Sequence, residues 1–254
     1  MSARGAFRRR ANAVLAAFRR RPTSGRVLLY HEIGDGGDPT AVVTPQVFRS
    51  QLGWLAAHGM RTVTVRQLLV SGLPPNAVAL TFDDGYASAV DACAELVRAR
   101  NTATTFVVPG WIDASRHGVC AWSDIVALAD RGIEVGAHDL EHERPCGTPV
   151  RILAERYRAA RLRIEDKIGT AVDGLAYPYG LAPDRARSAA LLAGYAYAVT
   201  SEPGRNTSGT DPFRIRRNEM HGTDATESAF VGKLAGSDDW FAPIRRLENR
   251  LACS

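Results

Sequence analysis

Residues 78–85 read Val-Ala-Leu-Thr-Phe-Asp-Asp-Gly, an apolar run that ends in two adjacent carboxylates and a glycine. The run predicts a buried strand, and ionised carboxylates belong at the end of such a strand rather than in its interior. A turn at Gly85 would allow both Asp83 and Asp84 to reach one cavity, although neighbouring strand residues point to opposite sides. Two carboxylates in one cavity repel each other, so they indicate a bound cation. An Asp-Gly turn that merely closes a strand is the alternative.

A second chemical cluster follows the short apolar segment 133–137, where His138 and His142 stand four residues apart. Two imidazoles at this spacing can face one metal ion if the backbone between them makes a helical turn. Two histidines and one carboxylate form a ligand set typical of catalytic sites, which keep one coordination position open. The sequence leaves open whether Asp139 hydrogen-bonds within this loop or adds negative charge near the metal.

The four cysteines are scattered along the chain and lack the close pairing of structural zinc sites. They are also too few to indicate a disulfide scaffold, so we expect free thiols. They are Cys93, Cys120, Cys146 and Cys253. Cys146 follows the histidine pair closely, but a role as a metal ligand is not favoured for it.

A third segment, residues 174–180, reads Gly-Leu-Ala-Tyr-Pro-Tyr-Gly. Pro178 interrupts an apolar strand and Gly180 permits an unusual turn, so the amide of Tyr179 can point into a cavity. In this order, the three segments resemble the motifs of the polysaccharide deacetylases, also called the NodB-homology or carbohydrate esterase family 4 enzymes. The resemblance covers about residues 27–233. It implies an α/β fold, an irregular (β/α) barrel of about seven parallel strands with its active site at the C-terminal strand ends.

The resemblance also implies a metal-dependent hydrolase that removes N-acetyl groups from N-acetylated sugars or glycans. Asp84, His138 and His142 would bind a divalent metal, with Zn²⁺ expected and Co²⁺ or Ni²⁺ as alternatives. Asp83 would be the general base, and the Tyr179 N–H would stabilise the oxyanion. Substrate contacts are expected from Tyr86, Tyr177, Pro178 and Arg217.

Two features depart from the better-known branch of this family. Residues 29–31 read Leu-Tyr-His near the start of the chain, whereas that branch has such a motif near its C-terminus. The order resembles the circularly permuted poly-N-acetylglucosamine deacetylases and implies His31 as the general acid, with His221 as the alternative. The arginine that orients the catalytic Asp in the better-known branch is replaced by Ala176, and Arg217 is our candidate for the substitute cation.

Hydrophobic periodicity predicts strands alternating with helices, a pattern typical of parallel strands joined by helical crossovers. We expect strands at residues 27–31, 62–65, 78–83, 103–108, 133–137, 175–177, 196–200 and 213–217. We expect helices at residues 45–57, 87–100, 123–130, 149–168, 183–193 and 226–234. The candidate residues fall at or just beyond C-terminal strand ends, where barrel enzymes place their active sites.

Charge is distributed unevenly. Residues 1–26 hold eight arginines and no acidic residue, while the whole chain carries +5, which leaves −3 for the remainder. We expect a basic tail or amphipathic helix at residues 1–25, with peripheral membrane contact through it as one role, and a deacetylase domain at residues 26–254. Nucleic-acid binding is disfavoured, because the remainder is acidic and carries no binding motif. Residues 1–26 do not form a clear export signal. We therefore expect a cytoplasmic protein, either associated with a membrane or free of it, with export as the alternative.

The substrate is not fixed by the sequence. An N-acetylated sugar or glycan is the expected partner. One alternative is a hydrolase of another C–N bond in a small molecule or glycolipid precursor. Another is a metal-binding pseudoenzyme that holds a glycan without cutting it, although binding alone would not need both Asp83 and Asp84.

Overall fold

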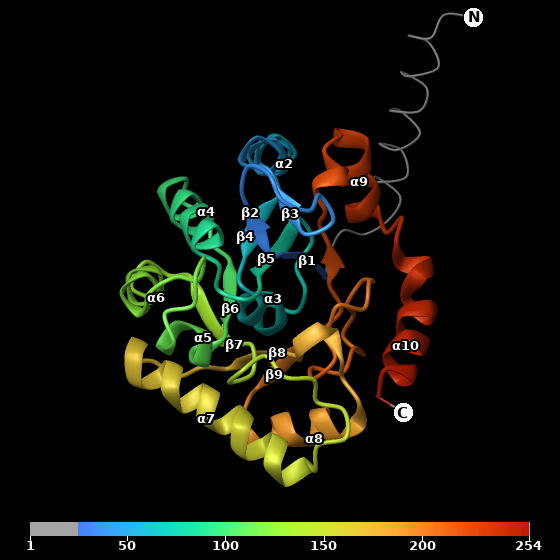
Figure 1. Cartoon of the computed structure of the whole chain (residues 1–254). Coiled ribbons are helices and arrows are strands. Elements are labelled where there is room, and N and C mark those ends of the chain that lie inside the picture. Colours follow the sequence, from blue (N-terminus) through green and yellow to red (C-terminus); the bar gives the residue numbers. More distant parts are fainter. Residues whose placement is uncertain (1–24, 254) are drawn as a thin grey trace, which may run out of the picture.

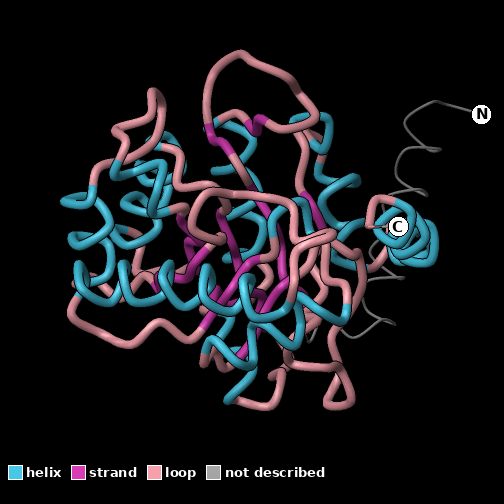
Figure 2. Tube along the Cα trace, turned by 60° about the horizontal axis from the view of Figure 1, so that its bottom comes forward, coloured by secondary structure: helices cyan, strands magenta, loops and turns pink. Residues whose placement is uncertain are grey.

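The structure, a computed structural model, describes residues 25–253. A parallel sheet curls into an irregular barrel, and helices cover its outer side (Figures 1 and 2). Seven strands follow the order β10-β1-β5-β6-β7-β8-β9, and β4 pairs with the first half of β5. The predicted fold class is therefore confirmed. The strands are β1 (Arg26–Tyr30), β4 (Arg61–Val63), β5 (Ala77–Phe82), β6 (Thr104–Val107), β7 (Glu134–Ala137), β8 (Gly174–Ala176), β9 (Tyr197–Val199) and β10 (Asn218–Glu219).

Helices connect successive strands and lie around the barrel (Figure 1). They are α2 (Pro45–Ala57), α3 (Val65–Val70), α4 (Ala87–Arg98), α5 (Pro109–Asp113), α6 (Trp122–Ala129), α7 (Val150–Ile168), α8 (Asp184–Ala193), α9 (Glu227–Ala235) and α10 (Ala242–Leu251). Short 3₁₀ turns are η1 (Pro178–Gly180), η2 (Gly222–Asp224) and η3 (Asp239–Phe241), and β2 (Glu32–Ile33) pairs with β3 (Val42–Val43) in a separate ribbon.

Local sequence explains where several helices begin and end. Thr44 caps α2, since its hydroxyl accepts a hydrogen bond from the Val47 N–H at 3.3 Å, and a proline follows at the first helical position. The α7 helix begins at Val150, with Pro149 at the N-cap position and no side-chain capping bond. Gly169 ends α7 with a left-handed φ of 70°.

Alternation along the strands separates the barrel interior from its outer side. On β5, Ala77 and Ala79 pack inside the barrel, whereas Val78, Leu80 and Phe82 pack outward against the helices. The β1 strand follows the same rule and pairs with β5 in parallel register along its whole length. Odd-numbered residues of these two strands therefore point inward, toward the axis of the barrel.

The barrel closes through residues 212–219, which cross from β9 to β1. The expected strand at 213–217 is wrong as to its bounds, because this segment meets β9 only at the bridge between Val199 and Ile215. It then forms β10, where Asn218 lies opposite Leu28 of β1. A segment that crosses the gap between two edge strands can pair with each of them over only a few residues.

The sequence pattern did not predict several short elements, namely β2, β3, α3, α5 and α10. Each has ten residues or fewer, too short for a periodic pattern to be distinctive. In the described range, no helix has the length and apolar character needed to cross a bilayer. The predicted basic segment lies, up to residue 24, outside the described residues.

The interior packing predicts a specific cost for filling a glycine site. A Cβ added at Gly136 would lie 2.4 Å from the Phe106 ring and 2.9 Å from the Gly174 carbonyl oxygen, whereas Gly53 on α2 has open space around it. We expect Gly136→Ala to lower the free energy of unfolding by about 1–3 kcal/mol. The matched change Gly53→Ala should leave it equal or raise it by about 0.5–1 kcal/mol. Urea unfolding of both variants checks this, and equal midpoints would contradict the packing described.

Candidate active site

The two adjacent aspartates meet in one pocket because the backbone turns between them. Asp83 continues the inward series of β5, so its side chain points into the mouth of the barrel. Asp84 would point outward on a continuing strand, but its φ of 72° and that of 74° at Gly85 turn the chain back. Both carboxylates line a pocket of about 470 Å³ at the C-terminal ends of the strands. A left-handed aspartate is strained backbone of the kind that gathers at functional sites.

The two histidines converge on Asp84 through a loop rather than a helix. His138 continues the inward series of β7. The expected helical turn is wrong, because Asp139 and His142 adopt left-handed φ values of 63° and 60°. These two residues bring both rings to the same carboxylate oxygen, and Asp84 Oδ1 lies 3.4 Å from His138 Nε2 and 3.5 Å from His142 Nε2.

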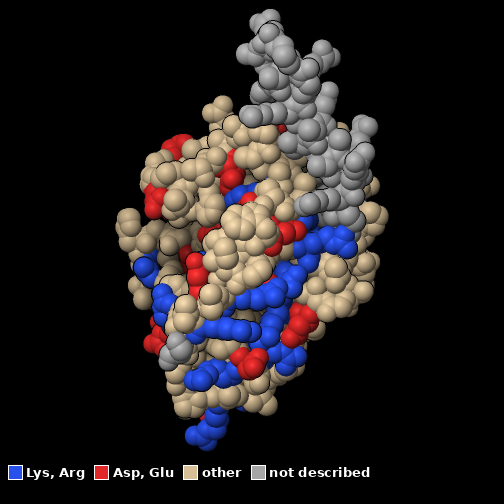
Figure 3. Space-filling view, turned by 90° about the vertical axis from the view of Figure 1, so that its right-hand side faces the viewer, with Lys and Arg blue, Asp and Glu red and all other residues tan. Residues whose placement is uncertain are grey.

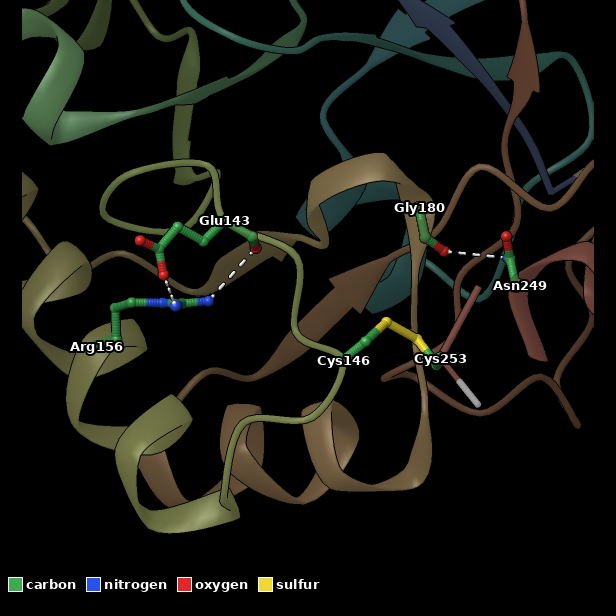
Figure 4. The surroundings of a disulfide bond; sticks show 6 residues. All are labelled: Glu143, Cys146, Arg156, Gly180, Asn249 and Cys253. Carbon is green, nitrogen blue, oxygen red and sulfur yellow. Dashed lines mark hydrogen bonds and ion pairs between the residues drawn. A yellow bond between two sulfur atoms is a disulfide. The ribbon is translucent and has the colours of Figure 1, made fainter. Parts of the chain in front are cut away.

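Asp139 organises this loop. Its carboxylate is fully buried, accepts from Arg156 Nε at 2.7 Å and accepts from the Glu143 N–H at 3.0 Å. Arg156 also reaches the side chain and the carbonyl oxygen of Glu143 (Figure 4). Of the two alternatives left open by the sequence, hydrogen bonding within the loop is therefore the one observed.

Three groups fit a divalent cation. The candidate ligand atoms of Asp84, His138 and His142 all lie within 4.8 Å of one another. Asp84 Oδ1 is buried and has no hydrogen-bond partner among residues 25–253. His138 Nδ1 donates to the Ala176 carbonyl oxygen at 2.9 Å, which leaves Nε2 free as a ligand. Burial and the neighbouring His138 lower the pKa of His142 to about 4, so its ring is the neutral form that binds metals.

Asp83 is paired with Arg217 instead of facing solvent. Both Arg217 terminal nitrogens lie 2.7 Å from the two carboxylate oxygens, and the guanidinium also donates to Thr81 Oγ1 and to the Thr200 carbonyl oxygen. Burial alone would raise the pKa of Asp83, but the charge of Arg217, followed by that of His138, lowers it to about 2. Asp83 is therefore ionised at neutral pH. Arg217, our candidate substitute for the arginine missing at position 176, thus forms an ion pair with Asp83.

His31 and His221, the two candidate acids, lie in different surroundings. His31 follows the inward series of β1, and the Asp83 N–H donates to the carbonyl oxygen of the preceding Tyr30 at 3.0 Å. His31 therefore lines the same pocket, with Nδ1 3.6 Å from Glu219 Oε1. His221 hydrogen-bonds through Nδ1 to the Thr40 carbonyl oxygen and is not among the residues that line this pocket.

Only Tyr179 lines the pocket among four candidates from the sequence, namely Tyr86, Tyr177, Pro178 and Tyr179. It has a left-handed φ of 59°, and its ring centroid lies 4.7 Å from that of His142. The expected substrate contact by Tyr177 is wrong, because the ring is fully buried and the hydroxyl donates to the Phe213 carbonyl oxygen at 3.1 Å. Pro178 is likewise buried, and Tyr86, at the N-cap position of α4, is not among the residues that line the pocket.

Arg217 lines the pocket, but its side chain is buried and its guanidinium is bound to Asp83. The pocket wall also includes residues that the sequence did not single out. They belong to the loop after the histidine pair, to the segment after β9, to β10 and to the last helix, namely Arg144, Ser201, Glu219, Arg245, Glu248 and Asn249. A basic amphipathic pattern in residues 242–251 was the one signal for the helical part of this wall.

A disulfide fixes this wall in place (Figure 4). Cys146, four residues after His142, is bonded to Cys253, and Asn249 Nδ2 donates to the Gly180 carbonyl oxygen at 3.4 Å. The expectation of four free thiols is therefore wrong for this pair, and Cys146 is not a metal ligand. Cys93 and Cys120 are free and buried. The two bonded cysteines are 107 residues apart in sequence, so only the fold brings them together.

Comparison with known proteins agrees with these motifs. A family model described as polysaccharide deacetylase matches residues 71–198, which contain the aspartate pair, the histidine pair and the tyrosine turn. The chain belongs to the polysaccharide deacetylase family. The match leaves out both His31 and Arg217, which lie before and after it.

Individual proteins are similar to this chain over more residues than the family model matches. This deacetylase is 26% identical over 204 residues to YxkH of Bacillus subtilis (strain 168), named as a polysaccharide deacetylase, covering 78% of this chain and 71% of that protein. In fold it is similar to IcaB from Ammonifex degensii, with a TM-score of 0.74, 23% identity and coverage of 83% and 97% of the two chains. It is also similar to the deacetylase PplD of Streptococcus pyogenes, with a TM-score of 0.73, 19% identity and coverage of 79% and 94%.

The buried ion pair predicts a pH-dependent loss of stability in Arg217→Met. Removing the cation leaves the Asp83 charge buried and unpaired, at a cost of about 3–5 kcal/mol at pH 7. In the wild type, Asp83 stabilises the fold above its unfolded pKa, and this contribution disappears as pH falls through about 2. In the variant the folded pKa is raised, so the cost should shrink on acidification.

Urea unfolding at pH 7 and at mildly acidic pH measures this effect. The control is Arg216→Met, which removes a partly exposed ion pair with Glu202 and should cost only about 0–1 kcal/mol with little pH dependence. Equal, pH-independent losses in the two variants would refute the role of Arg217 as the partner of a buried charge.

Proposed function

We propose that this deacetylase is a metal-dependent hydrolase that removes N-acetyl groups from N-acetylated sugars or glycans. One observation carries the proposal, which is that a single pocket contains the Asp84–His138–His142 trio together with an ionised Asp83 and His31. A glycan-binding pseudoenzyme would need no second, arginine-paired carboxylate beside the trio.

The trio would hold the metal, with Zn²⁺ expected and Co²⁺ or Ni²⁺ as alternatives, since two imidazoles and one carboxylate leave coordination positions open. When bound, such an ion polarises the acetyl carbonyl and lowers the pKa of a bound water. His138 is held for this task by its bond to the Ala176 carbonyl oxygen, and His142 by the loop that Asp139 organises.

The other residues have separate tasks in proton transfer. Asp83 takes the proton from the attacking water, and Arg217 keeps its carboxylate ionised and oriented. The Tyr179 N–H stabilises the negative charge that develops on the carbonyl oxygen. His31 gives its proton to the departing sugar amine, and its place on the strand beside Asp83 puts acid and base in one pocket.

Two further observations support parts of the proposal. The structure of PplD is a complex with acetate, the product that the proposed reaction releases. The disulfide between Cys146 and Cys253 favours an oxidising compartment over the cytoplasmic location expected from the sequence.

Adjacent isosteric substitutions should separate metal binding from catalysis. We expect Asp84→Asn to weaken metal retention by at least about tenfold, because a charged ligand is lost. Asp83→Asn should retain the metal and lower the rate of acetate release by about 10²–10⁴-fold, because the base is lost. Elemental analysis and an acetate assay on N-acetylglucosamine oligomers measure the two quantities. Full metal retention in Asp84→Asn, or near-normal turnover in Asp83→Asn, would overturn the corresponding role.

A pair of histidine variants should identify the general acid. His31→Ala should lower turnover by about 10²–10⁴-fold, whereas His221→Ala should stay within a few-fold of the wild type. Both variants should keep their metal, because neither histidine belongs to the trio. If His221→Ala is the impaired variant and His31→Ala is not, the assignment of His31 as the general acid is wrong.

A further inference from the structure

A second hollow adjoins the active-site pocket. Its volume is about 800 Å³, within the range of about 300–1,000 Å³ that is usual for small-molecule sites. Gly180 and Asn249 line both the hollow and the pocket, so the two spaces share a wall beside the tyrosine turn. A saccharide with one unit at the metal trio can therefore extend over this wall into the hollow.

Arginines dominate the lining of the hollow. Five arginines and three carboxylates line it, and none of its lining residues in the range 25–253 is aromatic. Figure 3 looks at the side of the molecule on which α10 lies and shows Lys and Arg crossing it in a band. The arginines are Arg205, Arg214, Arg216, Arg246 and Arg250, and the carboxylates are those of Asp184, Glu202 and Asp211.

Each of the three carboxylates is already engaged by an arginine. Glu202 is shared between Arg216 and Arg246. The other two carboxylates have arginine partners of their own, in the pairs Arg214–Asp184 and Arg187–Asp211. The acidic side chains of the hollow therefore do not neutralise its two remaining arginines.

Those two arginines are Arg205 and Arg250. Within the part of the chain that the structure describes, neither guanidinium has a carboxylate partner or a hydrogen bond. Arg250 is exposed on α10, whereas Arg205, in the segment after β9, is half-buried. A half-buried guanidinium has lost part of its hydration, and in Arg205 no protein acceptor among residues 25–253 offsets that loss. The two side chains therefore offer positive charge and open hydrogen-bond donors to a ligand in the hollow.

We propose that the hollow binds an anionic group, a phosphate or a carboxylate, of an N-acetylated saccharide whose acetylated unit lies at the metal trio. Arginine suits either group, because its planar guanidinium can donate two parallel hydrogen bonds to it. A neutral saccharide is disfavoured, since neutral sugars pack their apolar faces on aromatic rings and the described lining of the hollow has none. The inference rests on the proposed deacetylase function and narrows its substrate class to acidic glycans.

Acetate release by the full-length protein from three disaccharides tests the proposal. N,N′-diacetylchitobiose is neutral, its 1-phosphate adds a phosphate, and a disaccharide of N-acetylglucosamine and glucuronic acid carries a carboxylate. We expect a lower KM for at least one anionic probe than for the neutral one. That KM should rise with salt concentration, because salt screens the charges of an open hollow. The anionic probe with the lower KM identifies which of the two groups the hollow selects.

A double substitution assigns the effect to the hollow. Arg205→Gln/Arg250→Gln should raise the KM of the preferred anionic probe about tenfold at unchanged kcat, because the contact is equally strong in the ground state and the transition state. The KM of neutral diacetylchitobiose should not change. The matched control is Arg98→Gln/Arg131→Gln, which removes two exposed arginines at the ends of α4 and α6, away from α10 (Figure 1), and should behave like the wild type.

Two results would overturn the inference. One is a KM for both anionic probes that is equal to or above that of the neutral disaccharide. The other is the same KM for the preferred anionic probe in the hollow variant and in its matched control. Absence of acetate release from all three probes would instead contradict the proposed function. Calorimetric titration with the two anionic disaccharides then decides the inference, which stands if the wild type binds either one more tightly than the hollow variant does and fails if they bind alike.

Discussion

The ion pair between Arg217 and Asp83 is the interaction on which the rest of the site depends. It joins the closing segment of the barrel to its central strand β5, with both partners buried. A buried carboxylate without this cation would be protonated or would destabilise the fold, and neither state suits the general base that we propose. The same arginine bonds to Thr81 and to the Thr200 carbonyl oxygen, so the contacts that close the barrel also keep Asp83 ionised. The local fold and the chemistry therefore constrain each other.

A large part of this arrangement could be predicted from the sequence, because strands impose a simple geometry. Once β1, β5 and β7 are recognised as buried parallel strands, alternation places His31, Asp83 and His138 on the inner side at the same end of the barrel. Apolar runs bounded by turns are the strongest local signal that a chain offers. Motif order then supplied the family, and the matched family model agrees with it.

What the sequence could not provide depends on contacts between distant segments. The pairing of Cys146 with Cys253 spans 107 residues, and no local pattern indicates it. The loop between His138 and His142 takes left-handed turns at Asp139 and His142, residues whose spacing fits a helix equally well. Tyr177 appears in the sequence as a motif aromatic, but the parity of β8 buries it outside the pocket. Arg217 could be named as the cation that orients the catalytic Asp, but the sequence also offered it as a substrate contact, and only the segment that crosses from β9 to β1 shows its guanidinium bound to Asp83.

The disulfide has a mechanical consequence. It closes residues 146–253 into a covalent ring, so α10 cannot peel away from the barrel without pulling on the loop that carries His142. A displacement of α10 would therefore move a point four residues from His142, and the bond from Asn249 to the Gly180 carbonyl oxygen would pass it on to the tyrosine turn. The position of this outer helix is thus coupled, through one covalent bond and one hydrogen bond, to two of the loops that line the pocket.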